Sequence, residues 1–257
     1  MSGNSHWLSR ISPGPDLGFR DLAALGGLDP YGQHRLLWKF FDLPRDRKRA
    51  QTEFLFRAEV REGLPLFYVV SRIAPKDATG KWRIEPREYR PNLRVDDRLA
   101  FKLRANPVNL AKRDRDSAEV ASWARNREKR GLEAKDVTRK RVRYDVVMDA
   151  KQRMNWNDLA PADRPPLNQI AYDAGSCWLR QREERTGCDF GANRLRVDGH
   201  RVHRMNRRRG IVISTLDFEG ELQVTHPEAF VSALLTGIGP AKAFGCGLLL
   251  VRRIANL

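Results

Sequence analysis

The sequence predicts an α+β protein made of two tandem ferredoxin-like (RRM-like) domains, which occupy residues 1–94 and 95–257. The first observation is the order of predicted elements, β-α-β-β-β in the first half and β-α-β-β-α-β in the second. The second is the length of 257 residues, which is enough for two small domains with a core in each. The third is a hydrophobic fraction of 41% with six Trp, as in a folded chain. No sequence repeat has a fixed period, so the duplication would be one of structure only.

The first domain begins with a short predicted strand at residues 6–12, followed by a loop rich in Gly, Pro and Asp that runs to Leu28. Asp29 is a good N-cap, and Pro30 suits the first position of a helix. We therefore expect a helix over residues 31–41. Its large apolar side chains are interpreted as core rather than as base-stacking groups, and they are Leu37, Trp38, Phe40 and Phe41.

Three β-rich segments complete the first domain, at residues 52–60, 65–73 and 81–90. The first two are separated only by Arg61-Glu62-Gly63-Leu64, and this short spacing with a glycine predicts a hairpin.

The second domain begins near Asp97. Its predicted strands are at residues 99–106, 194–205, 210–224 and 246–253. A helix is predicted over 167–185, with Gly187 as its stop signal. A second helix is predicted to begin at a capping box that starts with Thr225 and to end near 236.

Residues 109–160 form a separate segment that is rich in both charges and has little consistent periodicity. We interpret it as an insertion between the first strand and the first helix of the second domain, with a helix over 117–130 at most. A solvated or partly disordered surface loop is the preferred interpretation. Contact with RNA or with neighbouring subunits is the alternative.

The formal net charge of +16 predicts a polyanionic partner. A membrane surface is the competing partner, but no long basic amphipathic helix and no apolar run of about 18–20 residues is present. The first ten residues lack the features of a signal peptide, so a cytoplasmic location is expected. Three widely spaced cysteines and the lone pair His200 and His203 favour reduced thiols over a disulfide framework or a metal site. No cofactor is expected.

The strongest motif is the run GIGPAKAFGCGLLLV at residues 237–251, which places four glycines and one lysine between a helix and a strand. It is not a P-loop, because the element order is reversed and the GxxxxGK[ST] motif is absent. The run resembles the glycine-rich loop of the repeat-associated (RAMP) proteins of CRISPR systems. With the FKLRANP strand at 101–107 and the DFEGEL segment at 217–222, it is similar to the CasE family, the type I-E CRISPR-associated endoribonucleases.

Tyr31 and His34 are the candidate catalytic pair. On a helix they share one face, and imidazole suits acid–base chemistry near neutral pH. His34 also lies close to the expected helix N-terminus, where the dipole opposes a charged ring. The spacing alone is a weak signal, but Tyr31-Gly32-Gln33-His34-Arg35-Leu36-Leu37-Trp38 matches the family's Y-x-x-H motif. The resemblance implies metal-independent cleavage by the substrate's own 2′-hydroxyl, with His34 as general acid/base. It implies that Tyr31 positions the reacting group or assists proton transfer.

The candidate RNA-binding residues fall into two groups. One is the predicted hairpin tip, where five arginines in nine residues concentrate positive charge, namely Arg201, Arg204, Arg207, Arg208 and Arg209. The other is the loop, with Lys242 and the amides of Gly237, Gly239, Gly245 and Gly247 as a nest for phosphate. Arg104 would bind RNA on the same face or form a structural salt bridge, and the sequence does not decide between them. The resemblance suggests that the hairpin grips the stem of the CRISPR repeat.

Three functions follow from these observations. The first is a CasE-type endoribonuclease that cuts the CRISPR repeat stem–loop, stays bound within the type I-E surveillance complex beside its backbone subunit, and meets target DNA only through that complex. The second is a non-catalytic RNA-binding subunit of the same complex. The third, an unrelated basic RNA-binding protein, is disfavoured by the glycine-rich loop.

Overall fold

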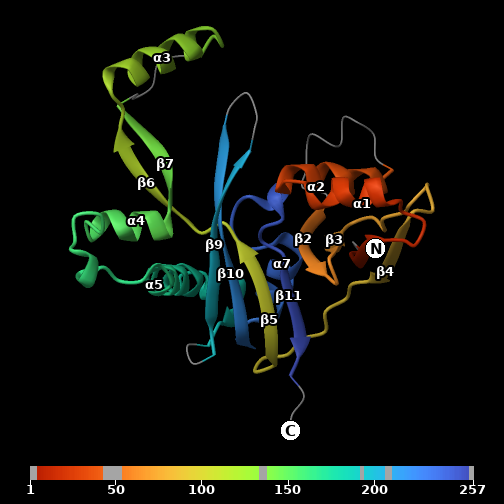
Figure 1. Ribbon diagram of the computed structural model, residues 1–257. Helices are drawn as coiled ribbons and strands as arrows, with labels where there is room; N and C mark the ends of the chain where they lie inside the picture. The colour runs from red at the N-terminus through yellow and green to blue at the C-terminus, as the bar shows by residue number, and fades with distance from the viewer. Residues whose placement is uncertain (1–4, 43–53, 133–137, 192–193, 206–209, 255–257) are drawn as a thin grey trace. The chain divides into compact units, whose positions relative to one another are not determined.

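The computed structural model divides into two compact units, Met1–Pro107 with Leu167–Leu257, and Val108–Pro166. Figure 1 shows the helices and strands of each unit. The structure describes residues 5–42, 54–132, 138–191, 194–205 and 210–254.

The first sheet of the larger unit is antiparallel, with the strand order β2-β3-β1-β4. Its strands are β1 (Trp7–Pro13), β2 (Phe54–Arg61), β3 (Leu64–Ser71) and β4 (Trp82–Glu88). The order is that of a ferredoxin-like domain in which no helix joins the last two strands, as the sequence predicts. The β2–β3 hairpin is confirmed, and its turn residues Glu62 and Gly63 both have positive φ, as a tight hairpin turn requires.

Two helices precede β2, and one of them was not expected. Helix α1 (Phe19–Gly26) occupies part of the segment that we interpreted as a loop. Its N-cap, Gly18, offers no capping side chain and none of its residues is buried, so neither a cap nor core packing marks this helix. Helix α2 (Pro30–Leu37) continues into the 3-10 turn η1 (Trp38–Phe40), as predicted. Leu37, Phe40 and Phe41 are buried in the core beneath them, and Trp38 packs against it.

The second sheet has the order β11-β5-β10-β8, and β9 also pairs with β10. The path β11-β5-β10-β9 is the ferredoxin-like order, and all pairs are antiparallel. The strands are β5 (Arg98–Ala105), β8 (Cys188–Asp189), β9 (Arg196–Met205), β10 (Ile211–Val224) and β11 (Leu249–Arg253). The helical elements are α5 (Leu167–Arg180), α6 (Glu183–Thr186), α7 (Pro227–Thr236) and the 3-10 turn η4 (Lys242–Phe244).

Helix ends were predicted with mixed success. Gly187 stops α6 in the left-handed conformation, as expected. The single helix predicted over 167–185 is instead the pair α5 and α6. The capping box at Thr225 is wrong, because the N-cap of α7 is His226 and no side chain caps it. Pro227 at the first helical position is the signal that begins this helix.

The smaller unit corrects the interpretation of residues 109–160 as a loop. It contains the hairpin strands β6 (Val108–Asp114) and β7 (Arg139–Asp145), the helices α3 (Ser117–Glu128) and α4 (Val146–Arg153), and the short turn η3 (Pro161–Asp163). The helix predicted over 117–130 is confirmed as α3, which a capping box of Asp116 and Glu119 begins. Asp114 and Arg139 form an ion pair across the hairpin, and Glu119 of α3 pairs with Arg113 and Lys140. Charged residues follow one another along both strands, so periodicity alone did not reveal them.

The two sheets of the larger unit share a small apolar cluster formed by Leu55, Val70 and Leu248. The domain boundary at residue 94 stays a prediction. It falls between β4 of the first sheet and β5 of the second. All three cysteines are free thiols. Among the helices that the structure describes, none is long and apolar enough to cross a membrane.

Candidate active site and nucleic-acid interface

Helix α2 presents Tyr31 and His34 one turn apart. Its start is set by Asp29, whose carboxylate accepts a hydrogen bond from the amide of Gly32 over 2.6 Å, and by Pro30 at the first helical position. The predicted N-cap is therefore confirmed. The two ring centroids are 6.3 Å apart, which brings the phenol and the imidazole within reach of one phosphodiester group.

The imidazole of His34 is partly buried among aromatic rings. It lies 5.3 Å from the ring of Phe54 and stacks at 20° on the ring of Phe56, with 6.1 Å between centroids. Burial lowers the pKa of His34 to about 4, so the ring is neutral at pH 7. The dipole argument was wrong, because α2 has only eight residues and His34 lies in its last turn, where a cation is favoured. Burial accounts for the neutral ring.

The tautomer of His34 follows from its contact with Trp38. The indole Nε1 of Trp38 donates a hydrogen bond to Nε2 of His34 over 3.2 Å. A ring nitrogen that accepts a hydrogen bond carries no proton, so the proton of the neutral imidazole is on Nδ1. Trp38 therefore acts on the site itself, a role that the sequence interpretation as core did not include.

The glycine-rich loop between α7 and β11 packs against α2. The ring of Phe244, at the end of η4, lies 6.3 Å from the ring of Tyr31. A Cβ at Gly245 would lie 3.2 Å from the ring of Phe56, which is the ring on which His34 stacks. The loop thus packs beside both Tyr31 and the ring beneath His34, and a side chain at Gly245 would press on that ring.

All four loop glycines have positive φ, which non-glycine residues rarely adopt, and they are Gly237, Gly239, Gly245 and Gly247. The tightest approach is at Gly247, with φ of 92°, where a Cβ would lie 2.9 Å from the carbonyl oxygen of Ile238. The glycines therefore serve first to fold the loop.

The prediction that the glycine amides bind phosphate is wrong for three of the four, because these three donate hydrogen bonds within the protein. The amide of Gly237 donates to the carbonyl of Ala233, that of Gly245 to Lys242 and that of Gly247 to Arg104, at 2.8, 3.3 and 2.7 Å. Amides with internal acceptors are not available to a phosphate. For Gly239, no internal acceptor is recorded within the described part of the chain.

Lys242 is partly buried at the start of η4. Burial and the nearby charge of Arg185 lower the pKa of its ammonium group. It stands on the same short turn as Phe244, whose ring contacts Tyr31 of α2. The phosphate contact of Lys242 stays a prediction.

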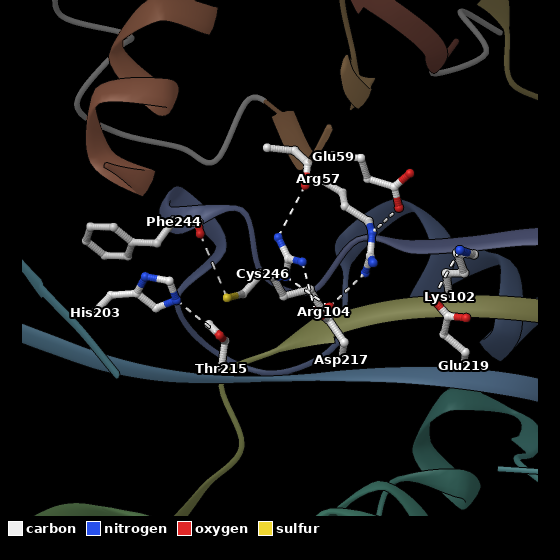
Figure 2. A network of polar contacts seen from close by, with 11 residues as sticks. Arg57, Glu59, Lys102, Arg104, His203, Thr215, Asp217, Glu219, Phe244 and Cys246 are labelled. Atoms are coloured by element: carbon white, nitrogen blue, oxygen red, sulfur yellow. Dashed lines mark hydrogen bonds and ion pairs between the residues drawn. The ribbon is translucent and has the colours of Figure 1, made fainter. Parts of the chain in front are cut away.

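Arg104 has the structural role that the sequence left open. Its guanidinium forms a two-pronged pair with Asp217 of β10, at 2.9 and 2.8 Å, and donates to the carbonyl of Ala58 in β2 over 3.2 Å (Figure 2). Asp217 also lies 3.4 Å from the buried guanidinium of Arg57, which pairs with Glu59. Asp217 thus joins the two sheets, and we remove Arg104 from the candidate RNA-binding set.

Two of the five hairpin arginines lie within the described residues. Arg201 and Arg204 are both exposed on β9, and since they are three residues apart they point to opposite faces of the strand. Arg207, Arg208 and Arg209 lie outside the described residues. Arg201 is close enough to His203 to lower the pKa of that imidazole.

His203 is a residue that sequence reasoning set aside. Its Nε2 lies 3.1 Å from the hydroxyl of Thr215 (Figure 2). Burial and the charges of Arg104 and Arg201 lower its pKa. Its position between Arg201 and Arg204 on a predicted strand was the sequence feature that could have marked it as a candidate site residue. No group of three or more metal-ligating side chains occurs among the described residues.

Comparison with known proteins identifies the family. The model of the family described as "CRISPR associated protein" matches residues 6–253. The chain belongs to this family. Two relatives place it within the type I-E CasE group. The CRISPR-associated endoribonuclease Cse3 of Thermus thermophilus is 26% identical over 95% of this chain and 99% of its own length. The CRISPR system Cascade subunit CasE of Escherichia coli is 26% identical over 86% and 90%.

A solved structure shares the CasE fold. The structure of Thermus thermophilus Cse3 bound to an RNA that represents a pre-cleavage complex matches with a TM-score of 0.60 and 26% identity, over 96% of this chain and 99% of that one. The two tandem ferredoxin-like domains predicted from the sequence are therefore confirmed as the fold.

Proposed function

We propose that this CasE-family protein is an endoribonuclease that binds the stem–loop of a CRISPR repeat and cleaves precursor CRISPR RNA to mature guide RNA. The observation that carries the proposal is the placement of Tyr31 and His34 on one face of α2, beside the glycine-rich loop. The net charge of +16 supports an RNA substrate. Both relatives carry CRISPR names, one as an endoribonuclease and one as a Cascade subunit.

In the proposed reaction, the 2′-oxygen next to the scissile bond forms a bond to phosphorus while the bond to the 5′-oxygen breaks. The 2′-hydroxyl gives up a proton and the leaving 5′-oxygen receives one, so the products are a 2′,3′-cyclic phosphate and a 5′-hydroxyl. No metal takes part in these steps. His34 exchanges the proton and the phenol of Tyr31 positions the phosphate.

The protonation of His34 changes when RNA binds. In the free protein its pKa is about 4. An anionic phosphodiester beside the ring favours the charged imidazolium and raises this pKa. Protonation at Nε2 requires the indole of Trp38 to withdraw its hydrogen bond, since two N–H groups cannot donate to each other. The complex then holds an acid that can protonate the 5′-oxygen.

The β9–β10 hairpin, with Arg201 and Arg204 on its first strand, is assigned to the repeat stem. A-form RNA hides its base edges in a deep major groove, so shape and phosphate contacts dominate. After cleavage the protein remains on the guide RNA within the type I-E surveillance complex, where it contacts the backbone subunit and meets target DNA only through that assembly. A cytoplasmic location is part of this proposal.

The test is cleavage of a labelled repeat hairpin in excess EDTA. Wild type, His34→Ala and Tyr31→Phe are compared with His226→Gln, which alters an exposed histidine whose side chain caps nothing. A second substrate replaces the 2′-hydroxyl at the scissile position by hydrogen. We expect cleavage at one site by wild type and His226→Gln, binding without cleavage by His34→Ala, slower cleavage by Tyr31→Phe, and no cleavage of the deoxy substrate.

The alternative is a non-catalytic RNA-holding subunit, and one observation favours it. His34 is packed among aromatic rings with Nε2 engaged, as a structural histidine would be. Tight binding of the hairpin by wild type without any cleavage would support this alternative. Cleavage by His34→Ala at the wild-type rate would overturn the assignment of His34.

A further inference from the structure

The start of the glycine-rich loop, at Gly239, packs against the buried Trp178, and Arg182 packs on the same tryptophan. Trp178, in the last turn of α5, lies so close to Gly239 that a Cβ there would be 3.1 Å from the indole ring. The guanidinium of Arg182 lies over the same ring, 3.6 Å from its centroid, and donates to the carbonyl of Trp178. Arg182 is thereby held at the base of the loop.

Two further cations lie near Arg182. Arg185, exposed on α6, lowers the pKa of Arg182 to about 10 together with burial, which is the larger cause. Burial and, as the smaller cause, the charge of Arg185 also lower the pKa of Lys242. The smaller cause in each case is repulsion between like charges. The geometry agrees, because Trp178 packs against Gly239 of the loop that holds Lys242 and also lies under the guanidinium of Arg182. Arg185 is the common member of both pairs.

These cations have no carboxylate partner among the described residues. In the ranges that the structure describes, no carboxylate forms an ion pair with Arg182, Arg185 or Lys242, although 16 other pairs of this kind are found there. The Nε of Arg182 is buried without an acceptor. The adjacent Glu183 is used elsewhere, since its carboxylate accepts from the amide of Phe190 over 3.1 Å. The three cations therefore form a group of hydrogen-bond donors that no described carboxylate neutralises.

We propose that Arg182, Arg185 and Lys242 form a phosphate-binding site for the RNA backbone, which extends the RNA path from the catalytic helix to α6. Guanidinium groups bind phosphate oxygens in pairs, and the ammonium of Lys242 adds a point charge. Lys242 and Phe244 bound the same 3-10 turn, and Phe244 contacts Tyr31. The phosphate held here therefore belongs to a nucleotide near the scissile one. This inference rests on the proposed function.

Arg185 repels both Arg182 and Lys242, so its replacement should affect RNA affinity and the stability of the free protein in different ways. Arg185→Gln removes the repulsion and one phosphate contact at once. We expect the midpoint of thermal unfolding without RNA to stay level or rise, while RNA binding weakens by about tenfold at low salt. The slope of log K against log salt should shrink by about 0.7–0.9. Cleavage at RNA concentrations below saturation should slow in proportion to the lost affinity.

Arg180→Gln is the matched control, since it makes the same charge change at an exposed position on the neighbouring helix α5. Arg185→Lys is the conservative variant and should keep the salt slope of wild type. The probe is the labelled repeat hairpin with its single-stranded flanks. Equal weakening by Arg185→Gln and Arg180→Gln would overturn the site, because the effect would then be one of net charge.

The two proposals fail in different ways. If wild type binds the RNA without cutting it, the proposed function fails, and the comparison of Arg185→Gln with Arg180→Gln still decides the phosphate site. If wild type cuts the RNA and both variants bind it as wild type does, only the phosphate site fails. If wild type does not bind the RNA, both proposals fall.

Discussion

Trp38 lies one helical turn after His34, and its indole nitrogen donates a hydrogen bond to Nε2 of His34 over 3.2 Å. This hydrogen bond is available only to the neutral imidazole, so it opposes protonation in addition to burial. The tryptophan that follows the Y-x-x-H motif is therefore part of the proton chemistry of the site.

Trp38→Phe should raise the pKa of His34 above its value of about 4. A neutral hydrogen bond contributes about 1 kcal/mol, so the increase should approach one unit. Titration of the His34 ring protons by NMR measures it, and the acidic limb of the cleavage rate should move in the same direction. Trp82→Phe, which alters a tryptophan that packs against Phe40, should leave the titration of His34 unchanged. An unaltered pKa in Trp38→Phe would remove the tryptophan from the mechanism.

The low pKa of His34 also makes stability depend on pH. The folded value of about 4 lies below the unfolded value of 6.5, so the unfolded chain binds more protons between them. The contribution of His34 to stability is present above pH 6.5 and is lost as the pH falls toward 4. Urea unfolding across this range should show a shallower loss for His34→Gln than for wild type. His226→Gln serves as the control and should follow wild type, whereas parallel curves for His34→Gln would refute the burial of a neutral ring.

The sequence predicted the fold well because its signals were local. Asp29 and Pro30 begin α2, Glu62-Gly63 turns the first hairpin and Gly187 ends α6, and each of these acts through its own backbone. Elements without such signals were missed. Helix α1 has no capping side chain and no buried residue, and the strands of the smaller unit have charged residues on both faces.

The site was predicted less completely, since its properties arise from contacts between distant segments. Arg104 resembled a phosphate ligand until its partner Asp217, on another strand, was seen beside it. The loop amides looked available until the fold supplied acceptors such as the carbonyl of Ala233. The floor beneath His34 comes from β2, in a later segment of the chain, and no pattern in the sequence connects the two.

Asp217→Asn should destabilise the larger unit strongly. Asp217 is 24% exposed and faces both Arg104 and the buried Arg57, so its neutralisation leaves two guanidinium groups without their shared carboxylate. Removal of one partner from a mostly buried charge pair costs about 3 kcal/mol. Chemical denaturation would measure this loss. Glu85→Gln, in an exposed pair with Arg10, should cost less than about 1 kcal/mol, and a similar loss in both variants would show that the Asp217 contacts are no stronger than a surface pair.

The last prediction concerns the shape of the glycine-rich loop. Gly247 and Gly80 both have positive φ, at 92° and 71°, so alanine at either position carries the backbone strain of roughly 1–2 kcal/mol. Only at Gly247 does the new Cβ meet a backbone atom, the carbonyl oxygen of Ile238 at 2.9 Å, whereas nothing lies within 4 Å at Gly80. Gly247→Ala should therefore lose about 1–3 kcal/mol more than Gly80→Ala.

Gly247→Ala and Gly80→Ala should also differ in their cleavage rates, because the loop packs against the side chains of α2. At a temperature where both variants are folded, Gly247→Ala should cut the repeat hairpin more slowly at saturating RNA, and Gly80→Ala should match wild type. Equal stability and equal cleavage in the two variants would mean that the loop tolerates a displaced backbone. The close approach of Gly247 to Ile238 would then not be what holds Phe244 against Tyr31.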